Sequence, residues 1–202
     1  MSIVDTPPTA RERRRRRTQE DLVEAAIRLI EADGVEAVTI ERLVDEAGLA
    51  RATVYAHFPD GRDGVLRAAY DRAGQDLLLR ASGAAASAST WSERILAYAR
   101  TMIEFSASPT LGRFYSLSGP ALVGFRDGGG AGTQGYRARL DAELGAARDA
   151  GEIRADADPA SLAILLSSSL RDAGIAAAHD PDSVERLVGA VGQILDGLRV
   201  RS

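Results

Sequence analysis

The sequence predicts an all-α protein, with an N-terminal helix-turn-helix domain, a connecting helix and a second helical domain. Apolar residues recur at spacings of three and four along most of the chain, which is the period of an amphipathic helix. Gly and Pro separate these periodic segments, and no segment has the alternating pattern of a strand. We assign residues 1–17 to an arm, 18–70 to the helix-turn-helix domain and 71–202 to the helical domain that follows.

The composition excludes several classes of protein. The chain has 202 residues, of which 45% are hydrophobic, and this is enough for a substantial core. It has no Cys and only two His, so disulfides and thiolate metal sites are excluded and we predict neither a metal nor a cofactor. No apolar run approaches the roughly 18 residues of a membrane span and no signal peptide is recognisable, so we expect a cytoplasmic protein without membrane contacts.

Positive charge is concentrated near the N-terminus. The net charge of −4 argues against a general nucleic-acid binder, yet six of the seven residues from Arg11 to Arg17 are Arg. All 25 basic residues of the chain are Arg, whose planar guanidinium suits phosphate oxygens better than an ammonium group does. We expect this arm to be disordered or partly helical.

Capping signals divide the first domain into helices. Thr18, with an acidic residue three positions later, fits a capping box that begins the first helix, and Gly34 is expected to end it. Thr39 is a good N-cap for the second helix, and Gly48 follows its last residue. The apolar stripe of this second helix comprises Ile40, Leu43, Val44 and Ala47.

The stretch GLARATVYAHF, residues 48–58, has two unlike faces. Leu49, Val54 and Phe58 are suited to anchor it to a small core. The side chains expected to project outward are those of Arg51, Ala52, Thr53, Tyr55 and His57. Arg reads guanine, Tyr and His reach phosphate oxygens, and the Thr methyl suits the thymine methyl. The helix pair is therefore interpreted as a helix-turn-helix; an ordinary helical hairpin with a solvated face is the alternative, and the nearby Arg run favours DNA.

Residues 24–70, EAAIRLIEADGVEAVTIERLVDEAGLARATVYAHFPDGRDGVLRAAY, resemble the DNA-binding domain of the TetR family of bacterial transcriptional repressors. The matching positions are Ala25-Ala26, Gly34, Thr39-Ile40, Ala47-Gly48-Leu49, Thr53-Val54-Tyr55 and His57-Phe58. The resemblance implies a homodimer that binds a near-palindromic DNA operator. It also implies a divergent C-terminal domain, which in this family usually binds a small effector.

Carried over position by position, the resemblance places the DNA contacts on Thr39, Arg51, Ala52, Thr53, Tyr55, His57 and Arg62. Two positions depart from the family pattern. Ala50 stands where the family often has Ser, which removes an N-cap worth about 1 kcal/mol. Arg62-Asp63 replaces the commoner Lys-Glu pair, and Arg62 keeps the charge needed to meet a phosphate.

Similar signals predict the helices of the rest of the chain. A fourth helix is expected over about 62–81, followed by a flexible joint in the segment ASGAAASAST. Thr90 and Glu93 form a further capping box. Residues 124–135, GFRDGGGAGTQG, are expected to be a loop or a broken helix before a helix over 134–150. Three other helices are expected to begin at cap-Pro pairs, which are Ser108-Pro109, Asp158-Pro159 and Asp180-Pro181.

Aromatic residues are concentrated in the second domain, because seven of the ten lie between Trp91 and Tyr136. A helical stripe that starts at Trp91 is suited to line a cavity for an apolar or aromatic ligand, and Arg171 offers a charge for an anionic ligand or an ion pair. The candidate ligand residues are Trp91, Tyr98, Met102, Phe105, Phe114, Tyr115 and Arg171. Plain core packing is the alternative for each of them.

The last two predicted helices carry continuous apolar faces. These faces comprise Leu162, Leu165, Leu166 and Leu170 on one helix and Val184, Leu187, Val188, Val191, Leu195 and Leu198 on the other. Two such helices from each of two copies form a four-helix bundle around a two-fold axis. We therefore expect a homodimer through the last two helices, and burial of these faces within one chain is the alternative.

The sequence offers little to an enzyme. The Gly-rich segment lacks the Gly-Lys-Ser/Thr of a phosphate loop, and no nucleophile-base pair is recognisable. We expect a dimeric, sequence-specific DNA-binding transcriptional regulator, a repressor released by a small apolar or aromatic effector. The alternatives are a DNA-binding regulator without an effector and a helical-bundle enzyme.

Overall fold

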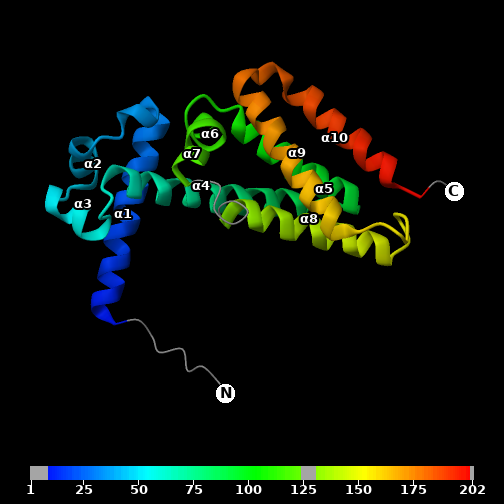
Figure 1. The fold of residues 1–202 in the computed structure, drawn as a ribbon, viewed down its shortest axis with the longest axis horizontal. Coiled ribbons are helices and arrows are strands. Elements are labelled where there is room, and N and C mark those ends of the chain that lie inside the picture. The colour runs from blue at the N-terminus through cyan, green and yellow to red at the C-terminus, as the bar shows by residue number, and fades with distance from the viewer. Residues whose placement is uncertain (1–8, 124–130, 201–202) are drawn as a thin grey trace. The chain divides into compact units, whose positions relative to one another are not determined.

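A computed structural model describes residues 9–123 and 131–200, and every regular element within them is helical (Figure 1). The α-helices are α1 (Ala10–Asp33), α2 (Ile40–Ala47), α3 (Arg51–His57), α4 (Arg62–Ala85), α5 (Trp91–Ser106), α6 (Leu111–Arg113), α7 (Gly119–Val123), α8 (Ala131–Asp149), α9 (Pro159–His179) and α10 (Val184–Leu198). Three short turns of other helix types are η1 (Val35–Ala37), η2 (Phe114–Ser118) and η3 (Pro181–Ser183). The expected all-α fold is confirmed.

The chain forms two compact units, Met1–Ala69 and Tyr70–Ser202, and the division falls inside α4. In the first unit the buried apolar side chains come from α1, α2, α3, the start of α4 and Val38. Those with 5% exposure or less are Leu22, Ala25, Ala26, Leu29, Ile30, Val38, Leu43, Val54, Val65, Leu66 and Ala69. Burial of these side chains stabilises the helices of the first unit, because helices as short as α2 and α3 are marginal alone.

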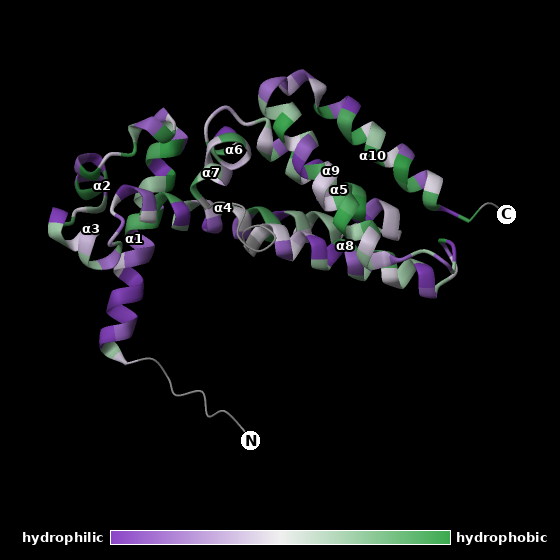
Figure 2. Ribbon diagram, in the orientation of Figure 1, coloured by the Kyte–Doolittle hydropathy of each residue, from purple (hydrophilic) through white to green (hydrophobic). Residues whose placement is uncertain are grey.

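The first helix begins earlier than the capping pattern at Thr18 predicts. Thr9 is the N-cap, its Oγ accepts from the backbone nitrogen of Glu12 at 3.2 Å, and its own backbone nitrogen donates to Glu12 Oε2 at 2.7 Å. Thr18 lies inside the helix, where its hydroxyl donates to the carbonyl of Arg14 at 3.1 Å. The Arg run is therefore helical, and it forms the hydrophilic first half of α1 in Figure 2.

The helix-turn-helix segment follows its predicted boundaries. Thr39 caps α2 by accepting from the backbone nitrogen of Arg42 at 3.2 Å. Gly48 ends α2 with φ 64° and ψ 36°, a left-handed conformation that favours glycine. Ala50 stands at the N-cap of α3 and supplies no side-chain hydrogen bond, as its methyl group requires.

Helix α4 is longer than predicted. It continues to Ala85, through the first residues of the segment that we expected to be a flexible joint. Ala is the best helix former, and Ala81 and Ala85 are both buried, so this small-residue stretch packs as helix. Composition alone therefore misjudged residues 81–85.

Of the predicted cap-Pro starts, the one at Ser108-Pro109 is wrong and the one at Asp180-Pro181 begins a 3-10 turn rather than an α-helix. No helix begins at Ser108-Pro109; α6 starts at Leu111, and Ser108 Oγ accepts from the backbone nitrogen of Gly112 at 2.9 Å. Asp180-Pro181 begins the 3-10 turn η3, and α10 follows from Val184. Asp158-Pro159 does start α9, with Pro at the first helical position.

The remaining boundaries of the second unit fall close to expectation. The Thr90–Glu93 capping box at the start of α5 is confirmed. Helix α8 starts at Ala131, so residues 131–135 of the predicted loop are helical, and residues 124–130 lie outside the described residues.

Helix α9 is central to the packing of the second unit. It contacts α5 and α8, and α5 also packs against α10. A Cβ atom at Gly174 of α9 would lie 2.6 Å from Ser106 Oγ of α5, so glycine permits the close approach of these two helices. Ile103, Ala177 and Val188 form a core cluster where α5, α9 and α10 meet.

By length and composition α9 is apolar enough to cross a membrane, contrary to the expectation that no segment reaches this threshold. Core helices of water-soluble proteins have the same composition. Eight residues of α9 are buried in the second unit, among them Leu166 and Leu170. We therefore interpret α9 as a core helix of the bundle.

Candidate DNA-contact surface and ligand cavity

Helix α3 is anchored on one side and open on the other. Val54 is wholly buried, whereas Arg51, Ala52 and Tyr55 are exposed. Thr53 and His57 are half-buried at the edges of this open face. The structure thus brings five of the predicted contact residues together along one short helix.

Arg51 is held by two neighbours on the open face. Its Nη1 donates to Glu41 Oε1 at 2.7 Å, and both side chains are more than 60% exposed. A hydrogen bond with Tyr55, followed by the charges of Tyr55 and Glu41, raises the pKa of Arg51 above its usual value. Because such an exposed ion pair is weak, a phosphate or base can displace Glu41.

The ring of Tyr55 rests on the turn between α3 and α4. Gly61 adopts φ 58°, and a Cβ atom there would lie 3.0 Å from a carbon of the Tyr55 ring. The space beside position 61 is therefore taken by the Tyr55 ring, while 44% of the residue stays exposed. The turn therefore directs Tyr55 without covering it.

Arg62, which the resemblance places against a DNA phosphate, is hydrogen-bonded to the protein backbone. Its Nε donates to the carbonyl of Val38 at 2.6 Å, and its Nη2 donates to the carbonyl of Val35 at 3.0 Å. These bonds tie the start of α4 to the η1 turn. The structure therefore gives the guanidinium a role in holding the first unit together.

Thr39 and His57 are each partly committed to the protein. The oxygen of Thr39 caps α2, which leaves its hydroxyl hydrogen available for donation. The Nδ1 atom of His57 is buried and has no hydrogen-bond partner among the described residues. A contact from His57 to DNA would therefore have to use Nε2.

The Arg run presents a second positive surface on the first unit. Arg11 and Arg13 to Arg17 are all exposed. Arg16 pairs with Glu20 at 3.0 Å, with 82% of its side chain still exposed. A helix of 3.6 residues per turn spreads these side chains around its whole circumference.

A cavity in the second unit collects side chains from α4, α5, η2, α7, α8 and α9. Its lining residues are Tyr70, Met102, Ser106, Tyr115, Ser116, Pro120, Thr133, Tyr136, Ser167, Leu170 and Arg171. It offers about 30 Å³ to the centres of water molecules. Of the predicted ligand residues, Met102, Tyr115 and Arg171 line it, and Trp91, Tyr98, Phe105 and Phe114 do not.

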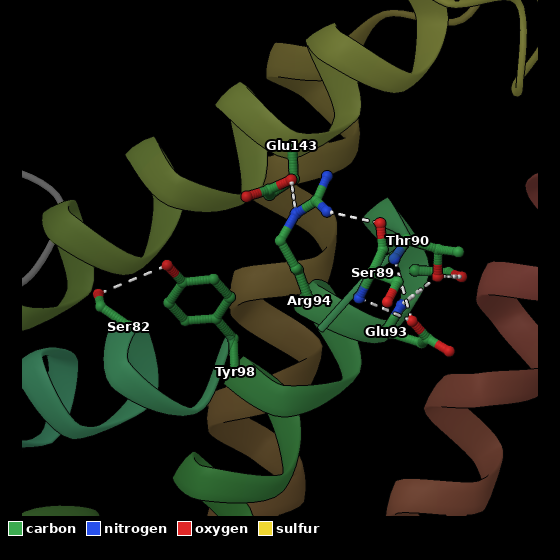
Figure 3. Close-up of polar contacts among 8 residues, drawn as sticks. Ser82, Ser89, Thr90, Glu93, Arg94, Tyr98 and Glu143 are labelled. Carbon is green, nitrogen blue, oxygen red and sulfur yellow. Dashed lines mark hydrogen bonds and ion pairs between the residues drawn. The ribbon is translucent and has the colours of Figure 1, made fainter. Parts of the chain in front are cut away.

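The other four predicted ligand residues pack elsewhere in the second unit. Trp91 is 2% exposed, with the guanidinium carbon of Arg199 5.7 Å from its ring centre. Tyr98 donates its hydroxyl to Ser82 at 3.4 Å, as Figure 3 shows. Phe105 lies under the guanidinium of Arg80, and Phe114 is a core residue with 2% exposure.

An ion pair joins α5 and α8 near Tyr98. Arg94 of α5 donates from Nε to Glu143 of α8 at 2.7 Å and from Nη1 to the carbonyl of Ser89 at 3.2 Å (Figure 3). The Arg94–Glu143 pair is largely shielded from solvent, so it holds α5 and α8 more firmly than a surface pair would.

Tyrosine rings dominate the wall of the cavity. The rings of Tyr70 and Tyr115 stack with centroids 4.9 Å apart and planes at 16°. Burial raises the pKa of Tyr70, Tyr115 and Tyr136 above the usual value, so these hydroxyls stay protonated at neutral pH. The Tyr136 hydroxyl is buried and has no hydrogen-bond partner among the described residues.

Most of the cavity wall was not predicted from the sequence, including Tyr70, Tyr136 and the Ser and Thr side chains. Spacing along one helix reveals its own faces only, whereas six elements converge on this cavity. The concentration of aromatic residues up to Tyr136 was a usable signal, although it does not separate cavity from core.

Three large apolar residues of α9 and α10 remain open to solvent. Ile164, Leu165 and Ile194 are 46%, 64% and 50% exposed. Much of the face predicted to bind a second copy is instead used inside the chain, because Val188 and Leu195 pack within the second unit. Among residues 9–123 and 131–200, no cluster of His, Asp and Glu is suited to hold a metal ion.

Comparison with known proteins agrees with this architecture. Residues 22–69 match the family described as bacterial regulatory proteins, tetR family. No curated protein sequence matches the chain. A TetR-family transcriptional regulator from Pectobacterium atrosepticum shares 22% identity with it, over 96% of this chain and 99% of that chain, with a TM-score of 0.81.

Two further solved structures contain ligands. RolR in complex with resorcinol shares 19% identity over 94% of this chain and 91% of that chain, with a TM-score of 0.70. FadR from Bacillus subtilis in complex with stearoyl-CoA shares 16% identity over 87% of this chain and 96% of that chain, with a TM-score of 0.64. Residues 22–69 therefore match the DNA-binding domain model of the tetR family of bacterial regulatory proteins, and the chain shares its fold with a solved TetR-family regulator along almost its whole length.

Proposed function

We propose that this protein is a cytoplasmic, homodimeric repressor whose two α3 helices bind successive major grooves of a near-palindromic operator. The observation that carries the proposal is the open face of α3, where Arg51, Ala52 and Tyr55 are exposed while Val54 is wholly buried behind them. A helix anchored in this way presents its polar side chains to base edges and phosphates. The half-sites would lie about 34–36 Å apart, one turn of the duplex.

The Arg-rich part of α1 supports the same proposal. Its exposed guanidinium groups suit phosphate oxygens, and they add affinity that does not depend on base sequence. Thr39 adds a hydroxyl donor at the start of α2.

Dimerisation is proposed through α9 and α10. Three large apolar side chains on these helices are exposed to water, which is unfavourable: Ile164 and Leu165 on α9 and Ile194 on α10. Pairing these two helices with those of a second copy would form a four-helix bundle and remove all three from water.

We propose that a small effector binds in the cavity and releases the repressor. Two neighbours of the same fold are described in complex with ligands, resorcinol in one case and stearoyl-CoA in the other. Helix α4 contributes Leu66 to the core of the first unit and Tyr70 to the cavity wall, one helical turn apart. An effector that displaces Tyr70 therefore acts on a helix that both units share, and it shifts repression only if it favours one conformation of the dimer.

A regulator without an effector is the second candidate. The cavity has room for about two water molecules, and four of the predicted ligand residues pack away from it. The tetR family comprises regulators, which favours either of these functions over an enzyme. Operator affinity that no cavity ligand changes would favour the second candidate.

The reading helix is tested by the double variant Arg51→Ala, Tyr55→Ala. An operator is first selected from random DNA with the wild-type protein, and its affinity is then measured by electrophoretic mobility shift. Each lost contact to base or phosphate costs about 1–3 kcal/mol, so we expect affinity to fall at least about a hundredfold. The oligomeric state should not change.

Arg154→Ala is the control, because this exposed arginine lies in the second unit. It should leave operator affinity within about threefold of wild type. Retention of wild-type affinity by the double variant would show that α3 does not read the operator.

A further inference from the structure

The cavity in the second unit is lined by Tyr136, whose buried hydroxyl has no hydrogen-bond partner among the described residues. Tyr136 is 2% exposed. A buried hydroxyl without a partner is costly, and most such groups in folded proteins are paired. Burial raises the pKa of Tyr136, so the unused hydroxyl is a donor at neutral pH. The cavity therefore offers a hydrogen bond to an acceptor that comes from outside the chain.

The walls that surround this donor are flat and aromatic. Tyr70 and Tyr115 of the lining stack at 4.9 Å. Behind the lining, Tyr98 meets the ring of Tyr136 edge-on at 5.8 Å. Met102 and Leu170 complete the apolar part of the lining. Rings and thioethers of this kind pack well against another planar ring.

The lining has one charged side chain, and it is positive. Arg171 reaches the cavity from α9, and among the lining residues there is no Asp or Glu. Burial raises the pKa of Tyr70 overall, and the charge of Arg171 opposes part of this rise, which is consistent with its position at the same wall. Asp71 follows Tyr70 on α4 and does not line the cavity, and burial raises its pKa. A guanidinium beside protonated hydroxyls is an arrangement that binds carboxylates.

We propose that the cavity takes a small aromatic acid, a single ring that bears a carboxylate. Arg171 pairs with the carboxylate, Tyr136 donates to an oxygen of the ligand, and the ring packs among Tyr70, Tyr115 and Met102. This inference rests on the proposed effector function and adds the chemical class of the effector.

Entry of a ring requires the cavity to widen. Its present room of about 30 Å³ for water centres is large enough only for water molecules, whereas a cavity that binds benzene is about five times larger. The stacked pair of Tyr70 and Tyr115 is the contact that a planar ligand would replace, since one ring can substitute for another in the stack. Ligand binding would thereby move a side chain of α4.

The test is calorimetric titration of the full chain, without DNA, with 4-hydroxybenzoate and with its neutral analogue 4-hydroxybenzamide. We expect the acid to bind at least about tenfold more tightly than the amide, because only the acid gains the charge-assisted bond to Arg171. Arg171→Gln should reduce this preference to about onefold. Tyr136→Phe should weaken binding of the acid by about threefold to tenfold.

The control variant is Arg139→Gln, an exposed arginine of α8 that does not line the cavity. It should keep the wild-type preference. Four outcomes would each overturn the proposal. They are equal binding of acid and amide, no binding of either, a preference that survives Arg171→Gln, and binding of hexanoate as tight as that of the aromatic acid.

Operator affinity measured with and without 4-hydroxybenzoate separates this inference from the proposed function. Binding of the acid without any change in operator affinity would refute release by an effector and leave the ligand class standing. Failure of the acid to bind, together with release of the operator by a ligand of another class, would refute the ligand class and leave release by an effector standing.

Discussion

Single residues at both ends of α3 decide how this helix is presented. Gly48 turns the chain out of α2 with φ 64°. Gly61 has φ 58°, and its lack of a side chain leaves space for the Tyr55 ring. Arg62 then fastens the start of α4 to the backbone of η1 through two hydrogen bonds. The residues proposed to contact DNA are thus positioned by residues that are not proposed to contact it.

Gly48→Ala tests the left-handed turn. A Cβ atom at Gly48 meets nothing within 4 Å, so the cost of the methyl group comes from the backbone conformation alone. We expect the free energy of unfolding to fall by about 1 kcal/mol in urea denaturation.

Gly145→Ala is the matched control for this substitution. Gly145 lies inside α8, and a Cβ atom there also meets nothing within 4 Å. Because Ala is the better helix former, this variant should gain up to about 1 kcal/mol. Equal effects of the two substitutions would contradict the strain assigned to Gly48.

Among the elements, α1 has a composition that changes along its length. Its C-terminal half buries Leu22, Leu29 and Ile30 in the core of the first unit. Its N-terminal half is exposed and carries the Arg run, with the Thr9–Glu12 capping box at its start (Figure 2). One helix thus serves as a structural member and as a positively charged extension.

The triple variant Arg14→Gln, Arg15→Gln, Arg17→Gln tests this extension. We expect the plot of the logarithm of operator affinity against the logarithm of salt concentration to become shallower. The slope should change by about one unit for each phosphate contact that the dimer loses. This slope is measured by fluorescence anisotropy with labelled operator, in titrations between low and moderate salt concentration.

A control triple variant removes the same charge from the second unit, at Arg139, Arg148 and Arg154. All three belong to the second unit, and its salt dependence should equal that of wild type. If both triple variants shift the slope equally, net charge alone explains the effect and the helical extension has no specific contact with DNA.

At the scale of the whole molecule, the proposed dimer depends on apolar surface of α9 and α10 that is exposed in the single chain. Ile164, Leu165 and Ile194 are exposed although α9 and α10 otherwise bury their apolar residues within the second unit. Two recognition helices can fill two half-sites together only when the chains are held as a pair.

Leu165→Glu is expected to yield a monomer. The substitution places a charge on a side chain that is 64% exposed in the single chain and buried in the proposed dimer. Light scattering after size-exclusion chromatography measures the mass, and operator affinity should fall with it. Leu79→Glu, at a residue of α4 that is 71% exposed, should remain dimeric. A dimeric Leu165→Glu protein would exclude this face as the interface.

By itself the sequence determined the all-α fold, the helix-turn-helix boundaries at Thr39, Gly48 and Arg51, and the family of the first domain. Caps, glycine turns and helical periodicity are local properties, so neighbouring residues suffice to specify them. Only the tertiary structure decided that Arg62 holds the η1 turn, and that Tyr70 and Tyr136, rather than Trp91 and Tyr98, form the cavity wall. Those outcomes depend on which side chains of separate helices converge, and convergence is a property of packing that no spacing along one helix contains.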